Sequence, residues 1–155
     1  MKTLALVLIF AAVTVFVEKE TPVTFRVSAG NPNRYVTAGN KGALDSSSKR
    51  IGSKQIFTLV DLKGGEIEDG EEVRIKWNTT YWQEDKTNGR VNRCPGKDMD
   101  PVSCAFKVKK PGRCIILQTA SGKFVVAPAD GGALVTTNAL GGATLFDLVE
   151  NPTAQ

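Results

Sequence analysis

The chain of 155 residues contains no histidine, which is the commonest general base in enzymes and a frequent ligand of zinc. Its absence excludes most nucleophilic triads and leaves the three cysteines without a partner to complete a zinc shell. The chain also lacks a phosphate-cradling loop and a dinucleotide-binding fingerprint, because its Gly-Gly pairs lie in turns rather than before helices. We therefore expect a protein that is not an enzyme and that uses no metal or cofactor.

Two polar segments are compatible with hydrolytic chemistry, but each has a simpler explanation. Acidic residues cluster at 66–72, and paired carboxylates hydrolyse glycosides when a cleft holds them at the right separation. Ser46–Lys49 places three serines before a lysine, as a Ser-Lys dyad would require. A solvated acidic loop and a polar hairpin loop account for the two segments without a catalytic role.

Basic residues give the chain a formal charge of +4, but they are scattered along it rather than gathered in one stripe. Nucleic-acid-binding domains present a denser basic surface with interleaved aromatic side chains. We therefore expect no nucleic-acid partner.

Long apolar runs are absent except near the N-terminus, where Met1-Lys2 precedes the uncharged segment Thr3–Val17. A basic start, a short apolar run and a polar boundary are typical of a secretory signal peptide, and the run is short for a membrane-spanning helix. We predict a signal peptide at residues 1–20 and a single secreted domain at 21–155, which contacts a membrane only if the leader is uncleaved. An uncleaved anchor and a first β-strand of a cytosolic protein are the alternatives, because no clean Ala-x-Ala site follows the run.

One pattern occurs twice in the chain, as RYVTAGNKGALD at 34–45 and as KFVVAPADGGALV at 123–135. Extending it divides the chain into three units, at about residues 23–62, 71–110 and 113–151. Each unit has an aromatic residue after its opening strand, an aliphatic residue after a glycine-bearing turn, and a closing phenylalanine. These residues are Tyr35, Trp82 and Phe124; Leu44, Val91 and Leu134; and Phe57, Phe106 and Phe146.

Short alternating segments such as FRV, VRI, FKV and FDLV are typical of half-buried strands, and Asn-Gly and Asp-Gly turns separate them. We expect opening strands at Phe25–Ser28, Val73–Lys76 and Ile115–Gln118, and no helix after Val17. Three pseudo-symmetric units of four strands predict an all-β protein, specifically a β-trefoil, in which three hairpins cap a six-stranded barrel. The repeated aromatic and aliphatic residues are then expected to share one core.

The repeats resemble those of the fascin-like β-trefoil domains. RYVTAGNKGALDSSSKRIGSKQIFTLVDL and KFVVAPADGGALVTTNALGGATLFDLV carry the resemblance, and the middle unit matches only loosely. It covers residues 23–151 and implies the fold rather than an activity, because it rests on core and turn positions. Fascins are cytosolic and bundle actin with four such domains, so actin binding is implied here only if residues 1–17 are not a signal. The Gln-x-Trp mark of ricin-type lectins is absent.

Aligning the repeats places Cys94 after the turn of the second unit and Cys104 before its closing phenylalanine, on two arms of one hairpin. We predict a disulfide between them, which would stabilise the diverged second unit by about 2–3 kcal/mol. Cys114 is then a buried, unpaired thiol, and the pairing of Cys104 with Cys114 is the alternative. Asn78-Thr79-Thr80 forms an N-glycosylation acceptor. We expect the domain to be a monomer.

We predict a secreted, non-enzymatic binding module whose partner is a glycan or a glycosylated surface. Sugar rings stack on aromatic side chains and sugar hydroxyls bind polar groups, so the candidate ligand-binding residues are Tyr81, Trp82, Gln83, Glu84 and Asp85. Trp82 has a second interpretation as the core aromatic of its unit, which would leave Tyr81 as the exposed ring. The alternative function is a protein-interaction or protease-inhibitor-type domain that docks through the loops 94–104 or 45–54.

Overall fold

The computed structural model describes residues 18–28 and 33–155, and this part of the chain is all-β, as predicted. Its twelve strands form one sheet in which every pairing is antiparallel, and its only helices are four 3-10 turns of three residues each. The strands are β1 (Lys19–Val27), β2 (Arg34–Ala38), β3 (Leu44–Ser48), β4 (Phe57–Asp61), β5 (Glu72–Trp77), β6 (Thr80–Asp85), β7 (Arg90–Pro95), β8 (Phe106–Lys109), β9 (Ile116–Thr119), β10 (Phe124–Val126), β11 (Val135–Thr137) and β12 (Phe146–Glu150). The 3-10 turns are η1 (Asn40–Gly42), η2 (Ser53–Gln55), η3 (Gly96–Asp98) and η4 (Leu140–Gly142).

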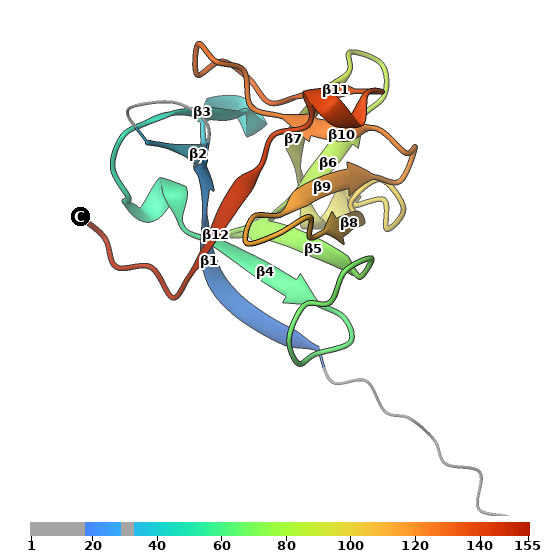
Figure 1. Cartoon of the computed structure of the whole chain (residues 1–155), viewed down its shortest axis with the longest axis horizontal. Helices are drawn as coiled ribbons and strands as arrows, with labels where there is room; N and C mark the ends of the chain where they lie inside the picture. Colours follow the sequence, from blue (N-terminus) through green and yellow to red (C-terminus); the bar gives the residue numbers. More distant parts are fainter. Residues whose placement is uncertain (1–17, 29–32) are drawn as a thin grey trace, which may run out of the picture.

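Six of the strands close into a ring (Figure 1). The pairs β1–β4, β4–β5, β5–β8 and β8–β9 follow one another, and β12 pairs with β1. An isolated bridge between Ile115 and Phe146 joins the segment before β9 to β12, with reciprocal N–H···O=C distances of 2.8 and 2.9 Å. Closure leaves these strands without a free edge at which another chain could add.

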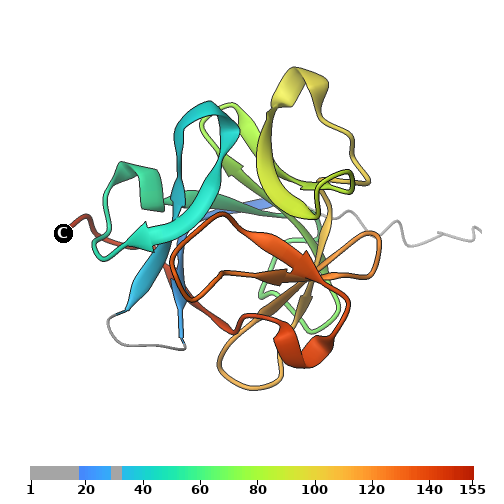
Figure 2. The same ribbon diagram turned by 90° about the horizontal axis from the view of Figure 1, so that it is seen from above.

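The other six strands form three hairpins, β2–β3, β6–β7 and β10–β11, which Figure 2 shows grouped around a common centre. The hairpins bond to one another there. The Leu134 N–H donates to the Leu44 carbonyl at 2.9 Å, and the Val91 N–H donates to the Leu134 carbonyl at 3.1 Å. The three repeated aliphatic residues therefore connect the hairpins through their backbones as well as filling the core.

Close approach between hairpins explains the glycines of the repeated pattern. Gly42 has φ +77°, and a Cβ atom there would lie 2.8 Å from the Arg93 carbonyl oxygen of the second hairpin. Gly131 has φ +81°, and a Cβ atom there would lie 3.3 Å from Cα of Ser47 in the first hairpin. Positive φ and a crowded backbone both favour glycine at these two positions.

All nine anchor residues of the three units are buried, with at most 8% of each exposed. The predicted shared core is confirmed for seven of them, whereas Tyr35 and Phe124 lie outside the core cluster and their neighbours Val36 and Val125 belong to it. Trp82 lies at its centre. Its ring centroid is 4.9 Å from that of Phe25, 5.2 Å from that of Phe57 and 6.3 Å from that of Phe106. These tilted and edge-to-face contacts are the arrangements that aromatic rings prefer.

The predicted opening strands match β5 and β9 closely, but β1 begins earlier than expected. Lys19 and Glu20, which the sequence interpretation assigned to the signal peptide, pair with Asp61 and Val60 of β4. The rest of that prediction, at residues 1–17, lies outside the described residues. Within the described ranges, we find no helix of the length and apolar character that crossing a membrane requires.

The acidic segment 66–72 folds across one end of the ring as a largely exposed loop. The Gly70 N–H donates to the Val108 carbonyl at 2.7 Å, and the Lys110 N–H donates to Oδ1 of Asp69 at 2.8 Å. Ile67 packs against the core from the middle of this loop. The loop therefore covers the core, and its carboxylates point largely to solvent, as a solvated loop requires.

Candidate functional site

The five predicted ligand-binding residues all lie on β6, and strand geometry divides them between its two faces. Trp82 and Glu84 point inward, with exposed fractions of 0% and 3%. Trp82 is therefore closed to an external ligand, and its second interpretation, as a core aromatic, is confirmed. The Glu84 side chain is buried as well, although this residue contributes to the lining of the depression described below. Tyr81, Gln83 and Asp85 are partly exposed on the opposite face.

Glu84 has a structural role in this arrangement. Its Oε2 accepts a hydrogen bond from Oγ of Ser121 at 2.5 Å, and Ser121 Oγ also lies 3.2 Å from Oγ1 of Thr119. Ser121 lies in the turn between β9 and β10 and Thr119 ends β9, so the buried carboxylate connects the second hairpin to the third unit. Oε1 of Glu84 is buried and has no hydrogen-bond partner within the described residues.

The outward face of the second hairpin carries an open depression of about 490 Å³, which Gln83 and Asp85 line and Tyr81 does not. Register across the hairpin sets Asn92 of β7 opposite Gln83, and Arg90 opposite Asp85. The residues that line the depression are Gln83, Glu84, Asp85, Lys86, Asn92, Arg93, Cys94, Pro95 and Ser103. Glu84 is hydrogen-bonded to Ser121 and Arg93 to a backbone carbonyl. The remaining amide and charged side chains are two amides, one carboxylate and one ammonium group.

Local hydrogen bonds orient the polar groups of the depression. Oδ1 of Asp85 accepts the Thr87 N–H at 3.0 Å at the start of the turn, and Nδ2 of Asn92 reaches Oδ2 of Asp85 at 3.5 Å. Tyr81 lies two residues before Gln83 on the same face, with its ring close to Gly96, where a Cβ atom would be 3.4 Å from Cε2 of the tyrosine. The site is thus built on paired strands rather than on a long loop.

Arg93 anchors this hairpin to the first one. Its guanidinium group donates to the Gly39 carbonyl, to the Ala43 carbonyl at 3.4 Å and to Oγ1 of Thr80 at 3.1 Å. The same group lies 4.8 Å from the ring centroid of Trp77, in a cation–π contact. Burial lowers the pKa of Arg93, and the carbonyl acceptors and the ring offset the cost of placing this charge there.

Five residues of the depression were not predicted, namely Lys86, Asn92, Arg93, Pro95 and Ser103. The sequence contained a signal for one of them. The Thr87-Asn88-Gly89 turn sets the pairing of Asp85 with Arg90, and counting back along both strands from that pair places Asn92 opposite Gln83. Ser103 comes from the loop before β8, and its carbonyl accepts the Glu84 N–H at 3.0 Å. No local pattern indicates that contact.

The structure brings the predicted cysteine pair together, although both residues are thiols. The Sγ atoms of Cys94 and Cys104 are 3.8 Å apart, well beyond the disulfide bond length of about 2.05 Å. The disulfide therefore remains a prediction. Cys104 is fully buried, and this burial, followed by the proximity of Cys94, raises the pKa of its thiol to about 12.

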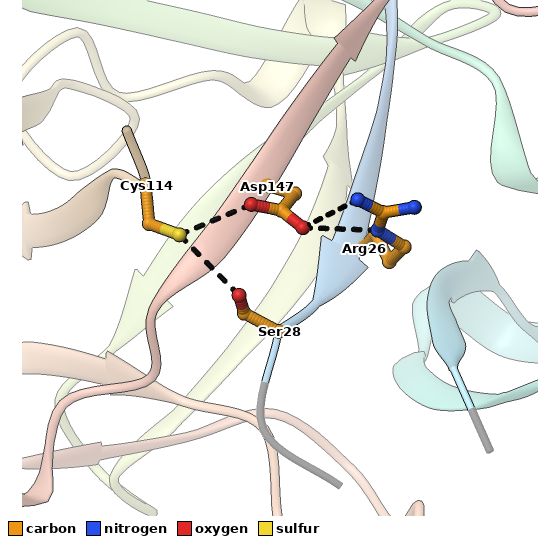
Figure 3. A network of polar contacts seen from close by, with 4 residues as sticks. All are labelled: Arg26, Ser28, Cys114 and Asp147. Atoms are coloured by element: carbon orange, nitrogen blue, oxygen red, sulfur yellow. Dashed lines mark hydrogen bonds and ion pairs between the residues drawn. The ribbon is translucent and has the colours of Figure 1, made fainter. Parts of the chain in front are cut away.

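Cys114 belongs to a different cluster, so the alternative pairing of Cys104 with Cys114 finds no support. The Cys114 thiol donates to Oδ1 of Asp147 at 3.0 Å and lies 3.3 Å from Oγ of Ser28 (Figure 3). Oδ2 of Asp147 accepts two hydrogen bonds from Arg26, at 2.6 and 3.0 Å. Cys114 was expected to be buried, but it is only half-buried, because this polar cluster lies near the surface.

Two further predicted features can be placed. Asn78 is exposed in the two-residue turn between β5 and β6, with φ +53°. Across residues 18–28 and 33–155, no three His, Cys, Asp or Glu side chains gather closely enough to hold a metal ion.

The comparisons with known proteins bear on the fold alone. No protein-family model matches the chain, and no curated protein matches it. Among solved structures, the chain is similar to the SDF2-like protein from Arabidopsis thaliana, with a TM-score of 0.68 over 86% of this chain and 95% of that chain. Sequence identity in this match is 8%, so the likeness shows a shared fold and does not extend to a ligand.

Proposed function

We propose that this protein is a non-enzymatic carbohydrate-binding module, with its ligand site in the depression on the β6–β7 hairpin. The observation that carries the proposal is the convergence of Gln83, Asp85 and Asn92 from two paired strands on one open space. Amides donate and accept hydrogen bonds, and carboxylates accept them, which matches the alternating donor and acceptor character of sugar hydroxyls. Tyr81 lies on the same face of β6, with its ring next to Gly96.

The fold that we propose for this module is the β-trefoil. Six strands in a ring and three capping hairpins, one from each sequence unit, support that assignment. Membership of the fascin-like family is likewise a proposal, and it rests on the repeated core and turn residues. Neither proposal implies a ligand, because function depends on the site and not on the fold.

The character of the surface favours a glycan over a large protein partner. Only three large hydrophobic residues are strongly exposed in the described part of the chain: Val102, Leu140 and Leu145. The centre of a stable protein interface is usually apolar and rich in aromatic residues. A small depression lined by amides and charged groups fits a polar ligand better.

Glycan-array screening followed by calorimetry with the best ligand tests the proposed function. We expect Gln83→Ala, Asp85→Asn and Asn92→Ala each to weaken binding by about tenfold or more, because each removes hydrogen bonds worth about 1–3 kcal/mol. Gln118→Ala changes a similar half-buried amide on β9, away from the depression, and should bind normally. Absence of any glycan ligand, or binding unaffected by all three changes, would overturn the proposal.

A second candidate function is docking on a protein through the loop 96–103. Asp100 braces this loop, because its carboxylate accepts the Val102 N–H at 3.2 Å and Oγ of Ser103 at 2.7 Å. Val102 is 62% exposed beside these contacts. A braced loop that presents an apolar side chain loses little entropy on docking. Inhibition in a protease panel that Val102→Asp abolishes would support this function.

We also propose that the protein is secreted and that its leader is cleaved before Lys19. Cleavage after residue 20 would remove two paired residues of β1. The intact mass of the protein recovered from culture medium tests this. A shortened chain in the medium is the expected result. A full-length chain found only inside cells would contradict secretion and would make actin binding the first function to examine.

A further inference from the structure

Two thiols of different accessibility meet at the wall of the depression. Cys94 is half-buried at the end of β7 and lines the depression, whereas Cys104 is 0% exposed. Their Sγ atoms are 3.8 Å apart, so a small movement of either side chain would bring them into bonding distance. A reagent entering the depression meets Cys94 first.

We propose that Cys94 is a site of reversible thiol modification, which reacts with a small-molecule disulfide and is then resolved by Cys104. In the first step, the Cys94 thiolate bonds to one sulfur of the small disulfide, whose S–S bond breaks and releases one small thiol. In the second step, the Cys104 thiolate attacks Sγ of Cys94, and the second small thiol leaves. The protein loses two electrons and two protons in total, and the small disulfide is reduced to two thiols.

The environment of each thiol sets the order and the speed of the two steps. Of these two thiols, only that of Cys94 is accessible to an external reagent, so the first step occurs there. The second step needs the Cys104 thiolate, which is scarce at neutral pH because burial and the neighbouring Cys94 raise the pKa of this thiol to about 12. The mixed disulfide on Cys94 therefore accumulates before the internal disulfide forms.

The two oxidised states have opposite effects on the depression, an inference that rests on the proposed function. Cys94 lies two residues from Asn92 on the same face of β7, so a group attached to its sulfur occupies the space next to that amide. The internal disulfide releases this group and joins β7 to the residue after Ser103. Ligand binding is thus blocked in the mixed disulfide and restored in the internal one.

The test uses the chain with Cys114→Ser, which leaves only the pair, and glutathione disulfide as the reagent. Intact mass and peptide mapping of acid-quenched samples should show glutathione on Cys94 first, and later a chain lacking two hydrogen atoms. The second rate should rise about tenfold per pH unit and continue to rise beyond the ordinary thiol pKa of 9.0. Glutathione on Cys104, no adduct on Cys94, or a rate that levels off near pH 9.0 would overturn the proposal.

Two further arms separate the thiol chemistry from folding and from glycan binding. Cys104→Ser should retain the mixed disulfide indefinitely. If that variant does not fold, a second measurement replaces it: alkylation of the reduced native chain should label Cys94 well before Cys104. A glycan identified by array should fail to bind the mixed disulfide and should bind again once the internal disulfide forms. If the masses behave as expected and glycan binding is unaffected throughout, the thiol site stands and the location of the glycan site is wrong.

Discussion

Asp147 shows how one residue joins distant parts of this chain. Its carboxylate accepts hydrogen bonds from Cys114, before β9, and from Arg26, on β1 (Figure 3). The Cys114 thiol contributes most to lowering the pKa of Asp147, and Arg26 follows. Because these partners favour the charged form of the carboxylate, they link the stability of the fold to pH.

We expect this cluster to lose its stabilising effect in acid. Since the pKa of Asp147 in the folded chain lies below its ordinary value of 3.8, the stabilisation is complete above that pH and disappears as pH falls through the folded value. Asp147→Asn should therefore lower the free energy of unfolding by about 1 kcal/mol near neutral pH, because the ion pair is partly exposed and solvent-screened. Urea denaturation of both proteins at neutral and acidic pH measures this effect. A deficit that persists unchanged in acid would show that the carboxylate charge is not its cause.

The close contact between the first and second hairpins depends on a single glycine. Gly42→Ala places a methyl group against the Arg93 carbonyl oxygen in a backbone conformation with positive φ. We expect it to reduce the free energy of unfolding by about 1–3 kcal/mol, and to loosen the hairpin that carries the proposed ligand site. Thermal denaturation and glycan affinity should both report the change.

Gly141→Ala is the matched control for that substitution. Gly141 lies in η4, and a Cβ atom there would have no neighbour within 4 Å and no positive φ to adopt. We expect its melting temperature to equal that of the unmodified chain. Equal losses from the two alanines would mean that neither the positive φ nor the crowding between hairpins explains the effect, because the lower entropy of the unfolded chain with alanine would by itself raise stability.

The strands were predictable from the sequence where burial repeats the same kinds of residue in each unit. Leu44 and Phe57 have counterparts in the other units because every unit contributes to one core. Tyr35 and Phe124 are buried outside that core, so the repeat did not show which residue of each aromatic-aliphatic pair points inward. The first half of β1 was missed, because Lys19-Glu20-Thr21-Pro22 lacks the apolar alternation of a strand, although it pairs with β4 along its length.

The site was less predictable because it depends on how strands face and pair. Five consecutive residues of one strand cannot meet one ligand, and the period of two alone would have assigned Trp82 and Glu84 to the interior. Asn92 was recoverable from the turn before it. Ser103 was not, because it reaches β6 through a backbone contact between segments that have no common sequence pattern.

Strand β1 joins two neighbours in the ring of six strands. It pairs with β4 through Lys19–Val23 and with β12 through Val23–Val27. A chain that begins at Glu18 keeps all of these pairs, whereas one that begins at Val23 loses four of the pairs with β4 and the Lys76–Glu20 ion pair of 2.7 Å. We expect the shorter chain to be less stable by about 1–3 kcal/mol, mostly through lost backbone hydrogen bonds.

Chemical denaturation of the two truncated chains tests this expectation, with Glu20→Gln in the longer chain as a control for the ion pair. That control should change stability little, because exposed ion pairs contribute at most about 1 kcal/mol. If both truncated chains unfold at the same denaturant concentration, the first half of β1 adds nothing to the barrel.

Pairing between β1 and β12 also determines when the protein can fold. Val23 pairs with Glu150, so the first strand of the barrel finds one of its partners only after nearly the whole domain has been synthesised. Topologies with such distant contacts fold slowly, because the entropy of closing a long loop must be lost before the contacts form. A nascent chain of this kind cannot close its ring of strands until β12 has been made.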